Sequence, residues 1–361
     1  MSSEPDRGDS RLSKTNRADP QNGEYIPSAR QSRKRRLTQC DDITLRSDVR
    51  DYAALDGDLA ITWNRAIRQY RGYLRDKENV KGVFESDTGQ TVRGSDPHRF
   101  HPDYSDKQYA KLKDLERGVS EEFGKRLHTA MLTFTASSTP NGDPLPPVDH
   151  LNELLSSWEA VRRALDRALD GRRYARLAIL EPHPGDGDNN GYLHIHMAVF
   201  IDGKVRQEDL APVISAHVRN CEFAQEDAHD PTDDSTISIR HAGADRADLD
   251  NDEQLDELAI YLAEYLGTYG DDDPLEEPEH VQAANAVLWA TQRQRWRPCQ
   301  TAQKYMSYDP PETDGEWRLI GIEKDGELIP CDRNSGGVDT FTTDTGPPDR
   351  PPTQPSSTGG E

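Results

Sequence analysis

The stretch Tyr192-Leu-His-Ile-His-Met-Ala-Val-Phe-Ile201 alternates between two kinds of side chain, which is typical of a β-strand. His194 and His196 face one side of such a strand. The apolar side chains that face the other side, which we expect to be buried, are Leu193, Ile195, Met197 and Val199. Two imidazoles that are two residues apart on one strand face can chelate a single divalent cation.

A third ligand is expected from the neighbouring strand. Tyr174–Glu181 reads as a strand that is joined to the histidine strand by the loop Pro182–Gly191, so Glu181 ends the preceding strand of the same hairpin. Two histidines and one carboxylate leave coordination positions open for water and a phosphate oxygen. His183 shares the face of Glu181 and is a competing ligand, although its two flanking prolines favour a loop role. The simpler alternative is that His-x-His happens to sit on a half-exposed strand.

The flanking periodicity predicts an α+β fold. The order is strand, helix, strand, strand, helix, strand, followed by one more helix. This is a split βαβ arrangement (ferredoxin- or RRM-like), an antiparallel sheet with helices against it, in which the first and third strands are central. The expected elements are a strand at Leu127–Ser137, a helix at Val148–Leu169, strands at Tyr174–Glu181 and Tyr192–Ile201, a helix at Val205–Val218, a strand at Thr236–Arg240 and a helix at Asp252–Leu266.

The last of these helices carries two tyrosines, Tyr261 and Tyr265, one turn apart on one face. A tyrosine hydroxyl that attacks a metal-polarised phosphodiester forms a covalent phosphotyrosine and frees a DNA 3′-hydroxyl, which is nicking and joining chemistry. The alternative is two aromatic side chains at the edge of an apolar stripe.

Three segments in order, MLTFTAS from Met131, then EPH…GYLHIHMAVF from Glu181, then YLAEYLG from Tyr261, resemble the motifs of the HUH-type rolling-circle replication initiators (Rep proteins) of haloarchaeal plasmids and viruses. The resemblance covers Leu127–Gly267. It implies that His194 and His196 are ligands of Mg²⁺ or Mn²⁺, that Glu181 is the third ligand, and that Tyr261 and Tyr265 are nucleophiles. Many relatives carry lysine immediately before the second tyrosine, where this chain has Glu264, so a phosphate-contacting lysine is in doubt.

The implied function is initiation of DNA replication. Such a protein nicks one strand of a supercoiled or single-stranded origin and leaves a 3′-end for the host replication machinery. Alternatives with the same chemistry are an HUH-class transposase or relaxase. A cupin-like metal oxidase also uses histidines and a carboxylate, but it usually needs glycine six residues before the first histidine, where this chain has Asp188. A DNA-binding regulator without catalysis is a third alternative.

The composition indicates a cytoplasm at very high salt. The chain of 361 residues has 66 Asp+Glu against 44 Lys+Arg, a net charge of −22, and far more Asp than Glu and Arg than Lys. High salt screens the repulsion between these acidic groups and strengthens apolar burial. No apolar run is long enough for a membrane span or a signal peptide, so we expect a soluble cytoplasmic protein. The four cysteines are widely spaced, which argues against a zinc ribbon or a disulfide framework.

The chain divides by composition into five predicted parts: a disordered tail at 1–38, a mainly helical region at 39–126, the catalytic domain at 127–270, an extension at 271–334 and a disordered tail at 335–361. Within the helical region, Gly82–Tyr104 reads as a loop. In the extension, Arg293-Gln-Arg-Trp-Arg297 suits phosphate contact and base stacking, or equally a surface arginine cluster that packs on Trp296. Lys324-Asp-Gly326 predicts a hairpin turn between Trp317–Ile322 and Glu327–Pro330.

Overall fold

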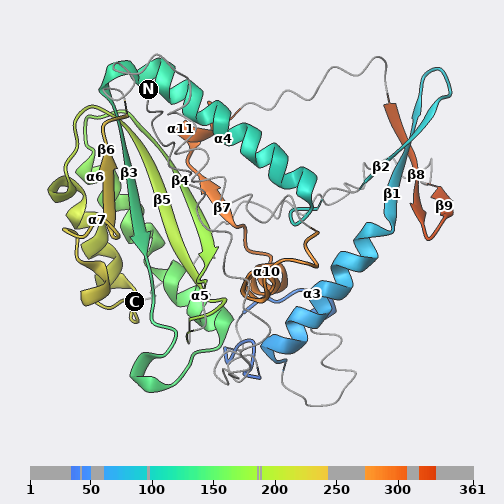
Figure 1. Ribbon diagram of the computed structural model, residues 1–361, viewed down its shortest axis with the longest axis horizontal. Helices are drawn as coiled ribbons and strands as arrows, with labels where there is room; N and C mark the ends of the chain where they lie inside the picture. The colour runs from blue at the N-terminus through green and yellow to red at the C-terminus, as the bar shows by residue number, and fades with distance from the viewer. Residues whose placement is uncertain are drawn as a thin grey trace, which may run out of the picture.

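The computed structural model describes residues 34–40, 43–49, 61–95, 98–184, 187, 189–242, 273–306 and 317–330. These residues form two antiparallel sheets and the helices that pack on them (Figure 1). The predicted α+β class is therefore confirmed.

The larger sheet carries the split βαβ arrangement. Its strands lie in the order β6-β3-β5-β4-β7, and all neighbouring strands are antiparallel. Their bounds are β3 Leu127–Phe134, β4 Tyr174–Pro182, β5 Leu193–Asp202, β6 Ile237–Arg240 and β7 Trp296–Pro298. Among the four strands of the motif, β3 and β5 are central as expected, and β7 adds a fifth strand at the edge of β4.

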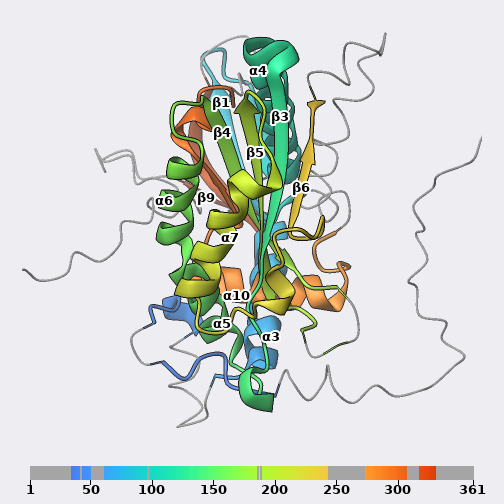
Figure 2. The same ribbon diagram turned by 90° about the vertical axis from the view of Figure 1, so that its left-hand side faces the viewer.

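Helices cover both faces of this sheet. On the first face lie α5 Pro147–Ser156, α6 Trp158–Ala168 and α7 Gln207–Asn220, which Figure 2 shows in front of the strands. On the opposite face lie α4 Pro102–Phe123 and α11 Gln300–Gln303. Short 3₁₀ turns are η1 Gly124–Arg126, η2 Pro140–Gly142 and η3 Asp227–His229.

The single helix expected over Val148–Leu169 is two helices in the structure, α5 and α6. The break falls at Ser157, whose hydroxyl is 2.7 Å from Nδ1 of the buried His217 on α7 and 3.3 Å from the carbonyl of Leu154. A local contact of a serine side chain with a nearby backbone carbonyl, as with Leu154, competes with a regular helix. The apolar stripe continues across the break, which is why periodicity alone predicts one helix.

The central strand β5 is buried on both faces. Ile195, Met197 and Val199 belong to the core cluster under α5, α6 and α7, whereas Ala198 and Phe200 belong to a second cluster under α4. The alternation inferred for this strand is therefore correct. His194 and His196 lie on the same face of β5 as Ala198 and Phe200, nearer to the start of the strand.

The first core cluster extends to two helices from distant parts of the chain, α3 Trp63–Glu78 and α10 Glu279–Thr291. The indole N–H of the fully buried Trp63 donates to the carbonyl of Ala283 at 2.9 Å. Leu37, also fully buried, joins the same cluster. The region before β3 thus shares one hydrophobic core with the larger sheet.

The second sheet corrects the expectation that Gly82–Tyr104 is a loop. It has the order β2-β1-β8-β9 and stands beyond α3, away from the larger sheet (Figure 1). Its strands are β1 Val80–Ser86, β2 Thr91–Ser95, β8 Trp317–Lys324 and β9 Glu327–Pro330. The predicted hairpin turn is confirmed, because Asp325 and Gly326 have φ values of 52° and 82°, as a two-residue turn of this kind requires.

One face of the small sheet is organised around Phe84. A Cβ atom added to Gly82 would lie 2.9 Å from the Phe84 ring, and one added to Gly94 would lie 3.6 Å from it. The ring therefore covers two paired glycines, which restores the packing that glycine lacks in a strand. On the other face, Arg93 and Glu323 form an ion pair at 2.6 Å.

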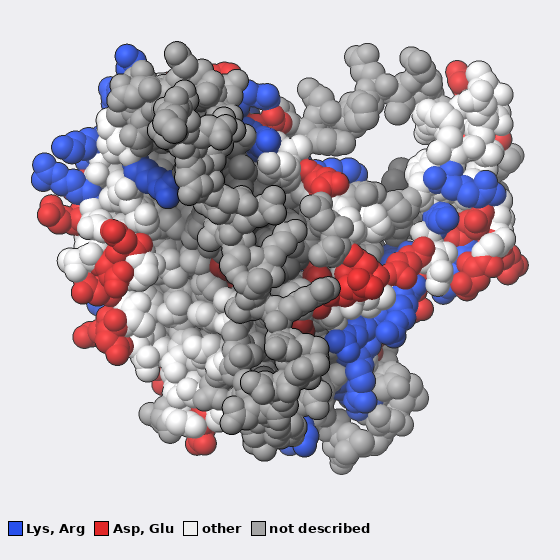
Figure 3. All heavy atoms as spheres, viewed as in Figure 1, with Lys and Arg blue, Asp and Glu red and all other residues white. Residues whose placement is uncertain are grey.

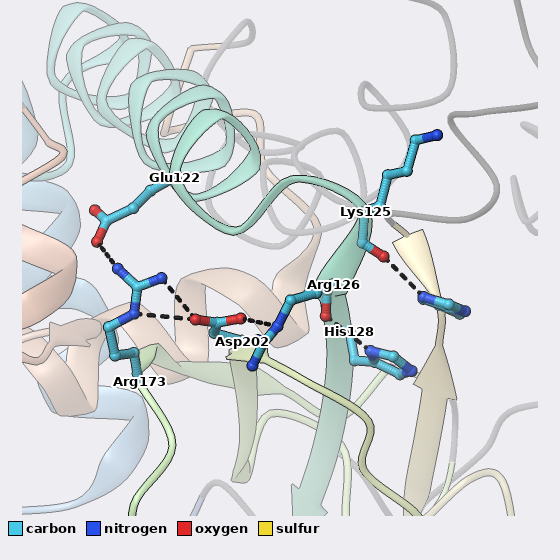
Figure 4. A network of polar contacts seen from close by, with 7 residues as sticks. Glu122, Lys125, Arg126, His128, Arg173 and Asp202 are labelled. Carbon is cyan, nitrogen blue, oxygen red and sulfur yellow. Dashed lines mark hydrogen bonds and ion pairs between the residues drawn. The ribbon is translucent and has the colours of Figure 1, made fainter.

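Asp202 holds together the end of the larger sheet where β3 begins and β5 ends (Figure 4). Its carboxylate, only 8% exposed, accepts from Nη2 of Arg173 at 2.6 Å and is 2.8 Å from Nε of Arg126. Arg173 also pairs with Glu122 of α4. At the same end, His128 stacks on His241 with ring centroids 4.0 Å apart.

The face of the described residues seen in Figure 3 is mixed in charge rather than uniformly acidic. Figure 3 shows Lys and Arg side chains gathered along α3 and around the start of β3, with acidic groups between them. Among the described residues, no helix is long and apolar enough to cross a bilayer.

Candidate metal centre

Three buried side chains converge on the second face of the larger sheet. Oε2 of Glu181 lies 3.1 Å from Nε2 of His194 and 2.8 Å from Nε2 of His196. The two Nε2 atoms are 2.8 Å apart. The exposed fraction is 8% for Glu181, 6% for His194 and 9% for His196. Three such donors, all aimed at one point, form the one group of this kind found among the described residues.

The strand pairing explains this convergence. Glu181 on β4 is directly opposite His194 on β5, and residues directly opposite in a ladder share a face. His196 follows two residues later on the same face. The hairpin therefore brings together the three residues that the sequence singles out as ligands, and the core on the other face fixes their backbones.

Thr133 on β3 also contacts this group, although the sequence did not single it out as a site residue. It pairs with His196 in the ladder, and its hydroxyl is 3.2 Å from His196 Nδ1. When Nδ1–H donates to this hydroxyl, Nε2 keeps its lone pair for a metal ion, which is the usual arrangement around ligating histidines. The alternation of threonine with apolar residues in Leu127–Ser137 was the available signal, because it places the threonines on the histidine side of the sheet.

The electrostatics favour a neutral His194 beside an ionised Glu181. Burial lowers the pKa of His194. Burial acts to raise the pKa of Glu181, but hydrogen bonds from His194 and His196 outweigh it and bring the pKa to about 2. Neutral imidazole and carboxylate are the protonation states that bind metal ions. The donor set therefore fits a divalent cation.

His183, the competing ligand, lies against the group without joining it. Its ring stacks on that of His194 with centroids 4.2 Å apart. Its backbone amide donates to Tyr192 and its carbonyl accepts from Gly191, which extends the hairpin by one step. Burial, followed by the influence of His194, lowers the pKa of His183 to about 3.

The two predicted nucleophiles, Tyr261 and Tyr265, lie outside the described residues, as does the helix expected at Asp252–Leu266. Their placement relative to the metal centre stays a prediction. Both tyrosines and the predicted helix fall within residues 243–272, between β6 and α10 in the sequence.

The fold and the site together define an α+β protein whose antiparallel sheet carries a buried carboxylate–diimidazole group. A family model described as "Putative rep protein (DUF1424)" matches residues 38–349, most of the chain. The chain belongs to this Rep family.

Two relatives from halophilic archaea are similar over most of their length. A protein of Halobacterium salinarum, called "Uncharacterized 36 kDa protein", is 42% identical over 281 residues, which cover 74% of this chain and 85% of the relative. A protein of the same description from Halobacterium sp. (strain GN101) is 42% identical over 275 residues, with 73% and 82% covered. These relatives agree with the halophilic composition. No solved structure matches the chain significantly.

Proposed function

We propose that this protein initiates rolling-circle replication by nicking and rejoining one DNA strand at the origin of its replicon. The observation that carries the proposal is the Glu181, His194 and His196 group, buried on the two strands β4 and β5 of a Rep-family chain. Family membership supports a role in replication, and the geometry supports metal-assisted phosphodiester chemistry.

In this proposal the three side chains hold Mg²⁺ or Mn²⁺ through one carboxylate oxygen and two Nε2 atoms. A bound divalent cation would supply Lewis-acid polarisation of the scissile phosphodiester. The protein's own contribution is to fix the donors. Thr133 orients His196, and the core under α5 and α7 holds β5 in place.

The nucleophile in this proposal is a tyrosine, with Tyr265 favoured for the first cut and Tyr261 for termination. The phenolic oxygen bonds to phosphorus and the bond from phosphorus to the 3′-oxygen breaks. The phenol loses its proton to solvent, and the departing oxygen takes one up. The product is a 5′-phosphotyrosine and a free 3′-hydroxyl, which a polymerase of the host extends. Attack of a later 3′-hydroxyl on the phosphotyrosine reverses the step and closes the strand.

The fold removes one alternative. Cupins are double-sheet jelly rolls, whereas this site sits on one antiparallel sheet covered by helices on both faces. A transposase or relaxase of the HUH class shares the proposed chemistry, and the family match favours replication over either.

The test is incubation of the protein with a supercoiled plasmid that carries the candidate origin, in molar KCl with Mn²⁺. We expect relaxed circles with protein attached to a DNA 5′-end, and no reaction with a chelator present. A matched plasmid without the origin controls for unspecific nicking. Relaxation without any covalent protein–DNA adduct would contradict the tyrosine mechanism.

A further inference from the structure

Trp296 lies in the same cross-strand row as the metal centre. It pairs with Ile179 of β4, and Ile179 pairs on its other side with His196 of β5. Directly opposite residues share a face, so the indole is on the histidine face of the sheet. It is two strands away from His196, about 10 Å at the usual spacing between strands. A nucleotide adjacent to a phosphate at the metal centre can reach that far.

The ring is held in place but not closed off. It packs against the second core cluster and retains part of its surface exposed. Lys111 of α4 places its ammonium 6.0 Å from the ring centroid. An indole with a cation over its ring provides the two groups that bind single-stranded nucleic acid, an aromatic ring for a base and a charge for a phosphate.

We infer that Trp296 and Lys111 form a platform on which a base of single-stranded DNA stacks beside the metal centre. This inference rests on the proposed function and adds a substrate contact to it. β7 is the edge strand of the sheet (Figure 1), so no further strand of the described residues covers that side of the row.

The composition gives a physical reason for a stacking contact here. The chain carries a net charge of −22, and in molar salt the screening length falls to about 3 Å, so phosphate contacts contribute less affinity than they do at low salt. Stacking on an apolar ring does not depend on counterion release, and salting out strengthens it. A DNA-binding protein that works at high salt therefore needs aromatic contacts, and Trp296 is placed to provide one.

A second tryptophan offers a matched control. Trp158 at the start of α6 is also partly buried and also has a cation over its ring, the guanidinium of Arg176 at 5.3 Å. It packs on the first core cluster, on the other side of the sheet from the histidines. The same substitution at Trp158 therefore removes a similar packing contact without touching the platform.

The first experiment measures binding of a fluorescein-labelled oligothymidylate by anisotropy, with the full chain in molar KCl and a chelator so that no cleavage can occur. We expect Trp296→Leu to weaken binding by between about fivefold and a hundredfold, the effect of losing one base–aromatic stack. Trp158→Leu should bind like the wild type. Thermal unfolding of both variants checks that each remains folded.

The second experiment keeps the inference testable if leucine disturbs the fold. Phe preserves most of the packing, so we compare the quenching of tryptophan fluorescence by the oligonucleotide in Trp296→Phe and Trp158→Phe. Quenching should be lost only in the first. Equal quenching, or unchanged affinity of a folded Trp296→Leu, overturns the platform while leaving nicking untouched. Conversely, if DNA binds through Trp296 but no covalent adduct forms on origin DNA, only the nicking proposal is refuted.

Discussion

Replacing His217 with glutamine should flatten the pH dependence of the stability of this protein. His217 is fully buried on α7. Its ring is 2.9 Å from the carbonyl of Thr135, to which Nε2–H donates, and Nδ1 accepts from the Ser157 hydroxyl at 2.7 Å. The neutral ring is thus fully satisfied, and protonation would bury a charge. Burial accordingly lowers the pKa of His217 from 6.5 to about 4.

The size of the effect follows from the two pKa values. Below pH 6.5 the unfolded chain takes up a proton on this histidine that the folded chain refuses, so the free energy of unfolding falls as the pH falls. Between about pH 6.5 and about pH 5, His217 should remove between about 1 and 2 kcal/mol of stability. Glutamine can donate to the Thr135 carbonyl in place of Nε2–H and has no charge to gain.

The assay is urea unfolding at fixed molar KCl, at several pH values across that range, for the wild type and His217→Gln. Glutamine packs less well than the ring, so the variant should be less stable near pH 7. The difference between the two proteins should then shrink by about 1–2 kcal/mol toward pH 5. The many carboxylates titrate equally in both proteins. Parallel pH curves would show that His217 titrates normally in the fold and would refute the reasoning.

The remaining predictions concern the proposed chemistry. His196→Ala should abolish nicking while the thermal unfolding midpoint changes little, because the opposite face of β5 still packs; retained nicking in this variant would argue against a metal role for His196. Glu181→Gln should weaken Mn²⁺ binding in a calorimetric titration by more than about tenfold and by more than His183→Gln does, since only Glu181 points a donor at both Nε2 atoms. The reverse order would make His183 the third ligand. Tyr265→Phe should lose the first nick, whereas Tyr261→Phe should still nick but release fewer closed circles; peptide mapping of the trapped adduct tells them apart, and a phosphotyrosine found only at Tyr261 would exchange their roles.

The larger sheet was predictable because its signals are local. A strand with a two-residue period, apolar on both faces except for two histidines, leaves few alternatives, and its hairpin with the preceding strand fixes which carboxylate meets them. Thr133 could not be assigned to His196 in the same way. Its register with β5 depends on a pairing across the intervening helices and β4, which no short-range pattern specifies.

The small sheet shows the opposite situation. β1 contains three apolar residues around a glycine and has no long alternation, so its sequence alone resembles a loop. It pairs on one side with β2 in a local hairpin, but its other neighbour, β8, lies more than 200 positions further along the chain. Tertiary contacts of this kind override local propensity, and they are invisible until the partner strand is known.

This long-range pairing also sets an order of assembly during synthesis on the ribosome. All strands of the larger sheet have been made once Pro298 is out, whereas β1 waits for Trp317–Lys324 before its second neighbour exists. Until then one edge of β1 carries unpaired backbone groups next to Phe84, a surface that invites association with other chains. A chain truncated before β8 would keep that open edge permanently. Among the described elements, the small sheet is thus the last to be completed during synthesis.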